Sequence, residues 1–132
     1  MSSSDLAYTA GFVDGEGCIH YRLDSNCGAM HRLEVSQKDR PVLDWLRSAV
    51  GAGRVSEHPN GKNTIHRWTC NRRKDVAALL TALLPFLKVK ARQAKLMLFA
   101  CKLSLSRPPG KKSKLLRRAL RLLEAEIKSE KH

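Results

Sequence analysis

The sequence has few aromatic residues, few acidic residues and no apolar run of the roughly 20 residues that a membrane-spanning helix requires. Phe, Trp and Tyr together make up 5% of its 132 residues. Its first residues, MSSSDLAYTAG, also lack the basic and apolar segments that form a signal peptide. These absences argue against a membrane protein and against a secreted one. We therefore expect an intracellular protein, in the cytoplasm or nucleoid or in an organelle of its host.

Cysteine is sparse as well, with four residues, at positions 18, 27, 70 and 101. None of them forms a C-x-x-C pair, and no histidine stands at zinc-ligand spacing from them. This pattern excludes the common structural zinc motifs and does not resemble a disulfide framework. We expect reduced thiols, mostly packed in the interior.

Acidic residues are outnumbered two to one, with 12 Asp and Glu against 25 Lys and Arg, which gives a net charge of +13 and a pI near 10.1. A charge of this size repels itself unless a polyanion relieves it. Nucleic acid is the first candidate, because each phosphate that a basic side chain neutralises releases a condensed counterion. A membrane surface is a weaker candidate, since no segment could insert.

The length and the 42% of hydrophobic residues are those of one ordinary globular domain. A helix is predicted over 2–15, with Ser3 or Ser4 as its cap and Gly15 at its end. Alternating patterns predict strands over 17–25 and 30–38, then over 53–58 and 63–71, and each pair brackets a turn. Apolar spacing predicts further helices over 40–51, 73–86, 88–104 and after 114. The order indicates an α+β fold, with helices on one face of an antiparallel sheet.

The other face of this sheet is predicted to be polar and rich in long hydrogen-bonding side chains. Its members are His20, Arg22, Asp24, Arg32, Glu34, Ser36, Arg54, Ser56, His58, Arg67 and Thr69. Strands that carry such groups can enter the major groove of DNA and read base edges, with arginine best suited to guanine. The alternative is that these residues merely form the solvated face that any such sheet has.

The segment AGFVDGEG, residues 10–17, places two carboxylates between glycines in this basic chain. It could simply be the end of a helix followed by a turn. Small residues, however, recur at helical spacing just before it, and they are Ala7, Ala10, Gly11 and Asp14 in one stripe. A stripe of this kind lets another backbone approach closely, so we expect the helix to cross a partner helix there.

This segment, read as YTAGFVDGEGCI, resembles the LAGLIDADG motif of homing endonucleases. Two further stretches, VSQKDRPVLDWLRSAVGAGRV and LLPFLKVKARQAKLML, look like the corresponding parts of family members that carry a single motif. The resemblance runs from about Leu6 to Leu105. It implies the αββαββα fold over residues 1–106, followed by a basic linker and an amphipathic helix over 107–132.

The resemblance also implies a set of site residues. Glu16 matches the acidic residue that binds metal, with the Gly15 carbonyl as a second ligand, and Asp14 matches a structural position at the end of the helix. Gln37 matches a polar residue that orders the hydrolytic water, and Lys90 matches a basic residue at the rim of the active site. Mg²⁺ suits such oxygen ligands, and Mn²⁺ can substitute for it. A basic residue near Arg40 could not be assigned.

One motif supplies one carboxylate, so the resemblance implies a homodimer that binds double-stranded DNA at a palindromic or pseudo-palindromic site. The implied reaction is metal-dependent hydrolysis of one phosphodiester on each strand, as in the homing of an intron or another mobile element. Two alternatives stay open: a DNA-binding regulator that does not cleave, and an RNA maturase that binds its intron RNA. The segment 107–132, with nine Lys and Arg against three Glu, could serve an RNA or grip flanking phosphates.

Overall fold

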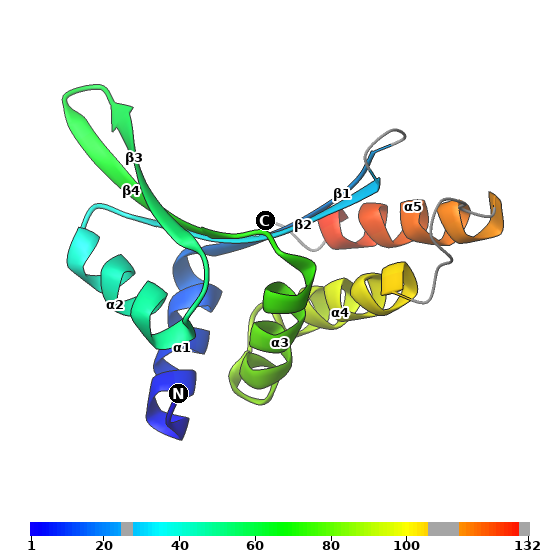
Figure 1. Cartoon of the computed structure of the whole chain (residues 1–132), viewed down its shortest axis with the longest axis horizontal. Helices are drawn as coiled ribbons and strands as arrows, with labels where there is room; N and C mark the ends of the chain where they lie inside the picture. The colour runs from blue at the N-terminus through cyan, green and yellow to red at the C-terminus, as the bar shows by residue number, and fades with distance from the viewer. Residues whose placement is uncertain (25–27, 106–113, 130–132) are drawn as a thin grey trace.

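The computed structural model describes residues 1–24, 28–105 and 114–129. Its elements follow one another as α1 (Ser3–Glu16), β1 (Gly17–Asp24), β2 (Gly28–Gln37), α2 (Arg40–Val50), β3 (Arg54–Asn60), β4 (Asn63–Cys70), α3 (Arg73–Leu83), a short 3-10 helix η1 (Leu84–Phe86), α4 (Ala91–Leu105) and α5 (Lys114–Ser129). The predicted α+β class and αββαββα order are confirmed. All helices lie on one side of a curved sheet, and the β3–β4 hairpin projects beyond them (Figure 1).

The sheet has four antiparallel strands in the order β1-β2-β4-β3, so β1 and β3 form its edges. The second hairpin turns through Gly61 and Lys62 between the paired residues Asn60 and Asn63. Gly61 has a φ of 64°, a left-handed conformation that glycine adopts without strain, which is why the PNGK segment makes a tight turn. The turn of the first hairpin lies outside the described residues.

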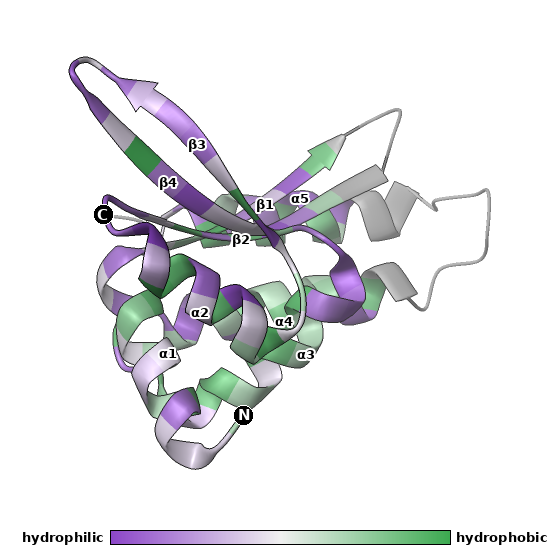
Figure 2. Cartoon of the chain, turned by 60° about the vertical axis from the view of Figure 1, so that its left-hand side comes forward, coloured by the Kyte–Doolittle hydropathy of each residue, from purple (hydrophilic) through white to green (hydrophobic). Residues whose placement is uncertain are grey.

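The face of the sheet under the helices forms the core. Ile19, Leu33, Val35 and Trp68 are fully buried there, together with the apolar sides of α2, α3 and α4. The indole N–H of Trp68 donates to the Ala52 carbonyl at 3.1 Å, so this large side chain leaves no donor unpaired. Colouring by hydropathy shows a mainly hydrophilic β3–β4 hairpin, whereas the helices carry both hydrophobic and hydrophilic stretches (Figure 2).

Helix α5 packs on the same core as the rest of the chain. Its Leu120 and Ile127 are fully buried. Glu124 accepts a hydrogen bond from the backbone N–H of Leu23 in β1 at 2.6 Å, and the Gln93 amide of α4 donates to the Ile127 carbonyl at 3.2 Å. The final helix is thereby tied to the edge of the sheet. The predicted linker before it lies outside the described residues.

Helix α1 begins and ends one residue away from its predicted limits. Ser2, rather than Ser3 or Ser4, is the cap, and its hydroxyl accepts from the N–H of Asp5 at 3.1 Å. The helix continues through Gly15 to Glu16, so the prediction that Gly15 ends it was wrong. Gly17 follows with an ordinary φ of −85°, and it must be glycine because a Cβ there would lie 2.7 Å from the Val13 carbonyl oxygen.

The described residues also test two of the expected absences. Within them, no helix is both long enough and apolar enough to cross a membrane. Cys18, Cys70 and Cys101 are free thiols, and burial raises the pKa of Cys70 and of Cys101 to about 11. These two thiols are buried in the core, as expected. Cys27 lies outside the described residues.

Candidate active site and nucleic-acid interface

The carboxylate of Asp14 is held inside the chain, at the junction of α1 with the segment that follows η1. It accepts hydrogen bonds from the backbone N–H groups of Lys88, at 2.8 Å, and Lys90, at 2.9 Å. Burial by itself would raise the pKa of Asp14, but these N–H groups, that of Val89 and the charge of Lys90 together lower it below its ordinary value. The prediction that Asp14 is a structural residue is confirmed.

Lys90 meets the end of α1 through its side chain as well. Its ammonium Nζ donates to the carbonyl oxygen of Asp14 at 2.7 Å. A cation at the C-terminal end of a helix is favourable, because the unpaired carbonyls there carry partial negative charge. Two predicted site residues, Lys90 and Glu16, are therefore brought to the same helix end from positions 74 residues apart in the sequence.

Glu16, by contrast, is exposed at the last position of α1. Among the described residues, its carboxylate takes part in none of the side-chain hydrogen bonds or ion pairs of this helix end. Gly15 is exposed too, and its carbonyl has no intrahelical donor, because the residue four positions on, Ile19, already belongs to β1. Two kinds of oxygen, one carboxylate and one carbonyl, are thus available at the foot of the helix.

Gln37 is the last residue of β2 and is half-buried. Its side-chain oxygen accepts from the N–H of Lys38 at 2.9 Å. Gly17 pairs with Val35 in the β1–β2 register, so the end of β2 runs beside the foot of α1. Of the three residues predicted to be catalytic, Glu16 and Lys90 meet at the end of α1, and Gln37 ends the strand that runs beside it.

The donor chemistry of this helix end fits a hard divalent cation. Carboxylate and carbonyl oxygens are the ligands that Mg²⁺ and Mn²⁺ take, and the negative end of the helix dipole favours a cation there. Within the described part of the chain, no group of three or more His, Cys, Asp or Glu side chains could hold a metal. Glu16 and Gly15 of one chain thus offer part of a coordination shell, and a second copy or a phosphate would have to supply the rest.

The open face of the sheet carries the predicted polar residues. Register pairs on one face include His20 with Arg32, Glu34 with Thr69, Ser36 with Arg67, Arg54 with Thr69, Ser56 with Arg67 and His58 with Ile65. Arg22, in the strand of His20, shares this face. The prediction that these residues share a face is confirmed, while their role in DNA binding stays a prediction. The side chain of Asp24 lies outside the described residues.

Several side chains on this face are organised by one another. An imidazole nitrogen of His20 lies 3.0 Å from a Glu34 carboxylate oxygen, and a nitrogen of His58 lies 2.9 Å from the Ser56 hydroxyl. The sequence analysis missed Ile65, whose pairing with His58 places it on the same face. The available signal was that Ile65 alternates in step with Arg67 and Thr69 along the strand. An apolar residue was not expected on a polar face.

The small-residue stripe of α1 is split between two sides of the helix. Ala10 is fully buried in the core of its own chain, so the prediction that it contacts a partner helix was wrong. Asp14 is likewise used inside the chain, whereas Ala7 and Gly11 are exposed and stay candidates for such a contact. The exposed stripe that the sequence analysis missed continues through Tyr8, which packs edge-on against Trp45 with ring centres 5.4 Å apart.

Arg40, the unassigned basic residue, begins α2 and is bound to two acids. Its guanidinium lies 2.9 Å from Glu57 in β3 and 3.5 Å from Asp44 one turn on. These ion pairs tie the start of α2 to the β3–β4 hairpin. Within the chain, Arg40 therefore has a structural role.

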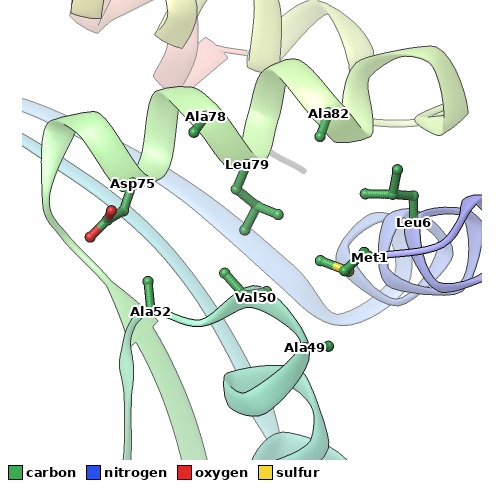
Figure 3. A pocket seen from close by; sticks show the side chains of 9 residues that line it. All are labelled: Met1, Leu6, Ala49, Val50, Ala52, Asp75, Ala78, Leu79 and Ala82. Carbon is green, nitrogen blue, oxygen red and sulfur yellow. The ribbon is translucent and has the colours of Figure 1, made fainter.

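An apolar cavity of about 280 Å³ lies near the N-terminal end of α1, whereas Glu16 is at its C-terminal end. The end of α2 and one side of α3 also line it (Figure 3). Leu6, Val50 and Leu79 line it, and Asp75 is its one charged lining residue. None of the predicted site residues borders it. The cavity is therefore separate from the candidate active site.

Comparison with known proteins decides the family. The sequence profile of the LAGLIDADG endonucleases matches residues 9–102, most of the chain. The chain belongs to the LAGLIDADG endonuclease family. The DNA endonuclease I-CreI of Chlamydomonas reinhardtii is 36% identical over 101 residues, which cover 70% of this chain and 60% of that protein. This LAGLIDADG chain thus spans about 60% of the length of its curated relative.

Solved structures share the fold of this LAGLIDADG chain. The homing endonuclease I-CvuI, crystallised with DNA in the presence of magnesium, has a TM-score of 0.81 at 24% identity, over 97% of this chain and 82% of its own. The archaeal intron-encoded homing endonuclease I-Vdi141I, complexed with DNA, has a TM-score of 0.84 at 20% identity, over 98% and 85%. The meganuclease I-AabMI, bound to uncleaved DNA, has a TM-score of 0.73 at 22% identity, but only 43% of its chain is covered.

Proposed function

We propose that the protein is a homodimeric, site-specific DNA endonuclease that makes metal-dependent double-strand cuts at a long pseudo-palindromic site. The observation that carries the proposal is the end of α1, where Glu16 stands exposed beside a lysine-capped helix terminus. Among the described residues, no hydrogen bond or ion pair within the monomer holds this exposed carboxylate. It is suited to recruit a cation.

The dimer follows from what one chain lacks. A single motif provides one such carboxylate, and the exposed side of α1 carries the small residues Ala7, Gly11 and Gly15. A Cβ at Gly11 or at Gly15 would meet nothing within 4 Å in the monomer, so the packing of the monomer does not require glycine at either position. Close approach by a second copy of α1 would require it. The 43% coverage of the I-AabMI chain is what one of two such units would give.

Double-stranded DNA is the proposed partner. The open face of the sheet holds arginines, histidines and hydroxyls, and the chain carries a net charge of +13. Phosphate neutralisation would supply most of the affinity, and base-edge contacts from the sheet would supply the sequence preference. Relatives crystallised with DNA include I-CvuI and I-Vdi141I.

The chemistry assigns a task to each residue of the helix end. Glu16 and the Gly15 carbonyl would hold Mg²⁺ or Mn²⁺, and the ion would activate water and stabilise the leaving oxygen of the phosphodiester. Lys90, anchored on the Asp14 carbonyl, places a positive charge beside the phosphate that is attacked. Gln37, at the end of β2, would orient the attacking water through its amide.

An enzyme of this kind would act on DNA inside a cell, as in the homing of an intron or another mobile element. A non-cleaving regulator would use the same sheet and charge without Glu16. A maturase would bind intron RNA instead. These alternatives differ from the proposal in the need for metal or in the nucleic acid that is bound.

The proposal is tested by incubating the protein with a randomised duplex library, in Mg²⁺ and in EDTA, and sequencing the ends that form. Glu16→Gln is run in parallel. Breaks at one palindrome-like site that need Mg²⁺ and disappear in the variant would support it. Tight, salt-sensitive DNA binding without breaks in Mg²⁺ or Mn²⁺ would overturn it in favour of the regulator. Preferential binding of RNA would favour the maturase.

A further inference from the structure

One arginine on the open face of the sheet lies between two short side chains. Arg67 lies in the central strand β4, and its register partners are Ser36 in β2 and Ser56 in β3. Serine side chains are short, so Arg67 is the longest side chain of this row. Ser36 follows Val35, and Val35 pairs with Gly17 directly after α1. The row of Ser36, Arg67 and Ser56 therefore begins near the C-terminal end of α1.

The side chain of Arg67 is also oriented. Its Nε donates to the Ser36 hydroxyl at 3.2 Å, which fixes the plane of the guanidinium at its inner edge. The two terminal nitrogens take no part in this bond. On this face of the sheet, Glu34 is the described acid closest in register, but its carboxylate lies 3.0 Å from a His20 nitrogen. Within the described residues, Arg67 forms no ion pair, so its outer nitrogens stay available for a ligand.

The other arginines of this face are placed differently. Arg32 donates from Nη2 to the Met30 sulfur at 3.4 Å, so one of its terminal nitrogens is already engaged within the chain. Arg22 and Arg54 are exposed residues of the edge strands β1 and β3. A long exposed side chain at an edge can follow a phosphate but has no fixed plane. Arg67 combines a central position with a fixed guanidinium.

A guanidinium with a fixed plane and two free nitrogens matches the O6 and N7 acceptors of guanine in the major groove. We propose that Arg67, positioned by Ser36, reads a guanine in each half of the DNA site, close to the centre of the site. The inference rests on the DNA-binding function proposed above, and it adds which residue sets the sequence preference and for which base. Two copies related by a twofold axis would read two symmetry-related guanines.

The test is selection of bound sites from a randomised duplex library in EDTA, so that cleavage plays no part. Wild-type protein should select one guanine per half-site that Arg67→Ala no longer selects. Replacing that guanine should weaken wild-type binding by about 10- to 100-fold and leave Arg67→Ala unaffected. Arg67→Lys keeps the charge but not the bidentate geometry, so it should retain the salt dependence of binding and lose the guanine preference.

Two control variants separate base reading from phosphate contact. Ser36→Ala should keep the same guanine with a weaker preference, because the guanidinium loses its anchor. Arg54→Ala should weaken binding to all sequences alike and lower the salt dependence. If Arg67→Ala behaved like Arg54→Ala, or still selected the guanine, the inference would be overturned while DNA binding stood. If the wild type selected no site, the proposed function itself would fail.

Discussion

The two sides of helix α1 differ in the contacts that their residues make. On the inner side, Ala10 and Val13 are fully buried, and the Asp14 carboxylate is bound by two backbone N–H groups. On the outer side, Gly11, Gly15 and Glu16 are exposed. Contacts within the monomer explain the residues on the inner side. They do not explain the glycines and the carboxylate on the outer side. We infer that the outer side is made for a second chain, a metal and DNA.

The two acids of the motif show this difference most clearly. Asp14 and Glu16 are two residues apart, yet the first stabilises the junction with the segment before α4 and the second has no part in it. The predictions that follow exchange or remove groups on one side at a time. Changes on the outer side should affect function and assembly, and changes on the inner side should affect stability.

The largest effect is expected for Glu16→Gln on the outer side. Loss of the charged metal ligand should reduce DNA cleavage by on the order of 10²–10³-fold or more, because a stabilising group at the reacting phosphate is lost. Binding of the same DNA in EDTA should change by no more than a few fold. Cleavage rates and binding isotherms on the selected site check both parts. Full cleavage by the variant would contradict the assignment.

The next effect concerns assembly. Gly11→Leu adds a bulky side chain where the monomer has open space, so the monomer should stay folded while the dimer dissociates. We expect dimer affinity to fall by about 100-fold, as a few kcal/mol of lost helix packing would give. Sedimentation equilibrium measures this effect. Ala125→Leu, on the exposed side of α5, is the matched control and should leave the mass unchanged.

On the inner side, Gly17→Ala should destabilise the fold. The added Cβ would lie 2.7 Å from the Val13 carbonyl oxygen and 2.9 Å from the Val13 Cα, so backbone has to shift. We expect a loss of about 1–3 kcal/mol in the free energy of unfolding. Denaturant titration in the Gly11→Leu background avoids coupling to the dimer. In the same background, Gly15→Ala should be neutral or slightly stabilising, because the position has open space around it. An equal loss of stability in Gly17→Ala and Gly15→Ala would refute the crowding argument.

The smallest effect is expected for Asp14→Asn. One side-chain oxygen is replaced by a donor that faces a backbone N–H, so about 1–2 kcal/mol should be lost at neutral pH. The pKa of Asp14 is lowered in the folded state, so its contribution is present above its ordinary value of 3.8 and disappears as the pH falls below that value. The difference between wild type and variant should therefore shrink as the pH falls below 3.8. A constant difference would contradict the role assigned to the charge.

The sequence predicted the sheet better than the helix. Strand side chains alternate with a period of two, so one register decides a whole face, and the polar residues of β2 and β4 were placed correctly. Small residues three and four apart on a helix do not reveal which of them faces the core, and Ala10 was therefore misassigned. The role of Glu16 came from the family resemblance. The ties of Asp14 to Lys88 and Lys90 join residues more than 70 positions apart, which local patterns could not show.

The central claim is that Glu16 on the outer side binds the metal and Asp14 on the inner side does not. It is tested most directly by calorimetric titration of Ca²⁺, a hard cation with the same oxygen preference, into the complex of protein and selected DNA. The account predicts that the wild type and Asp14→Asn complexes bind the ion and that the Glu16→Gln complex binds no more than the DNA alone. Unchanged ion binding by Glu16→Gln, or its loss in Asp14→Asn, would contradict the account.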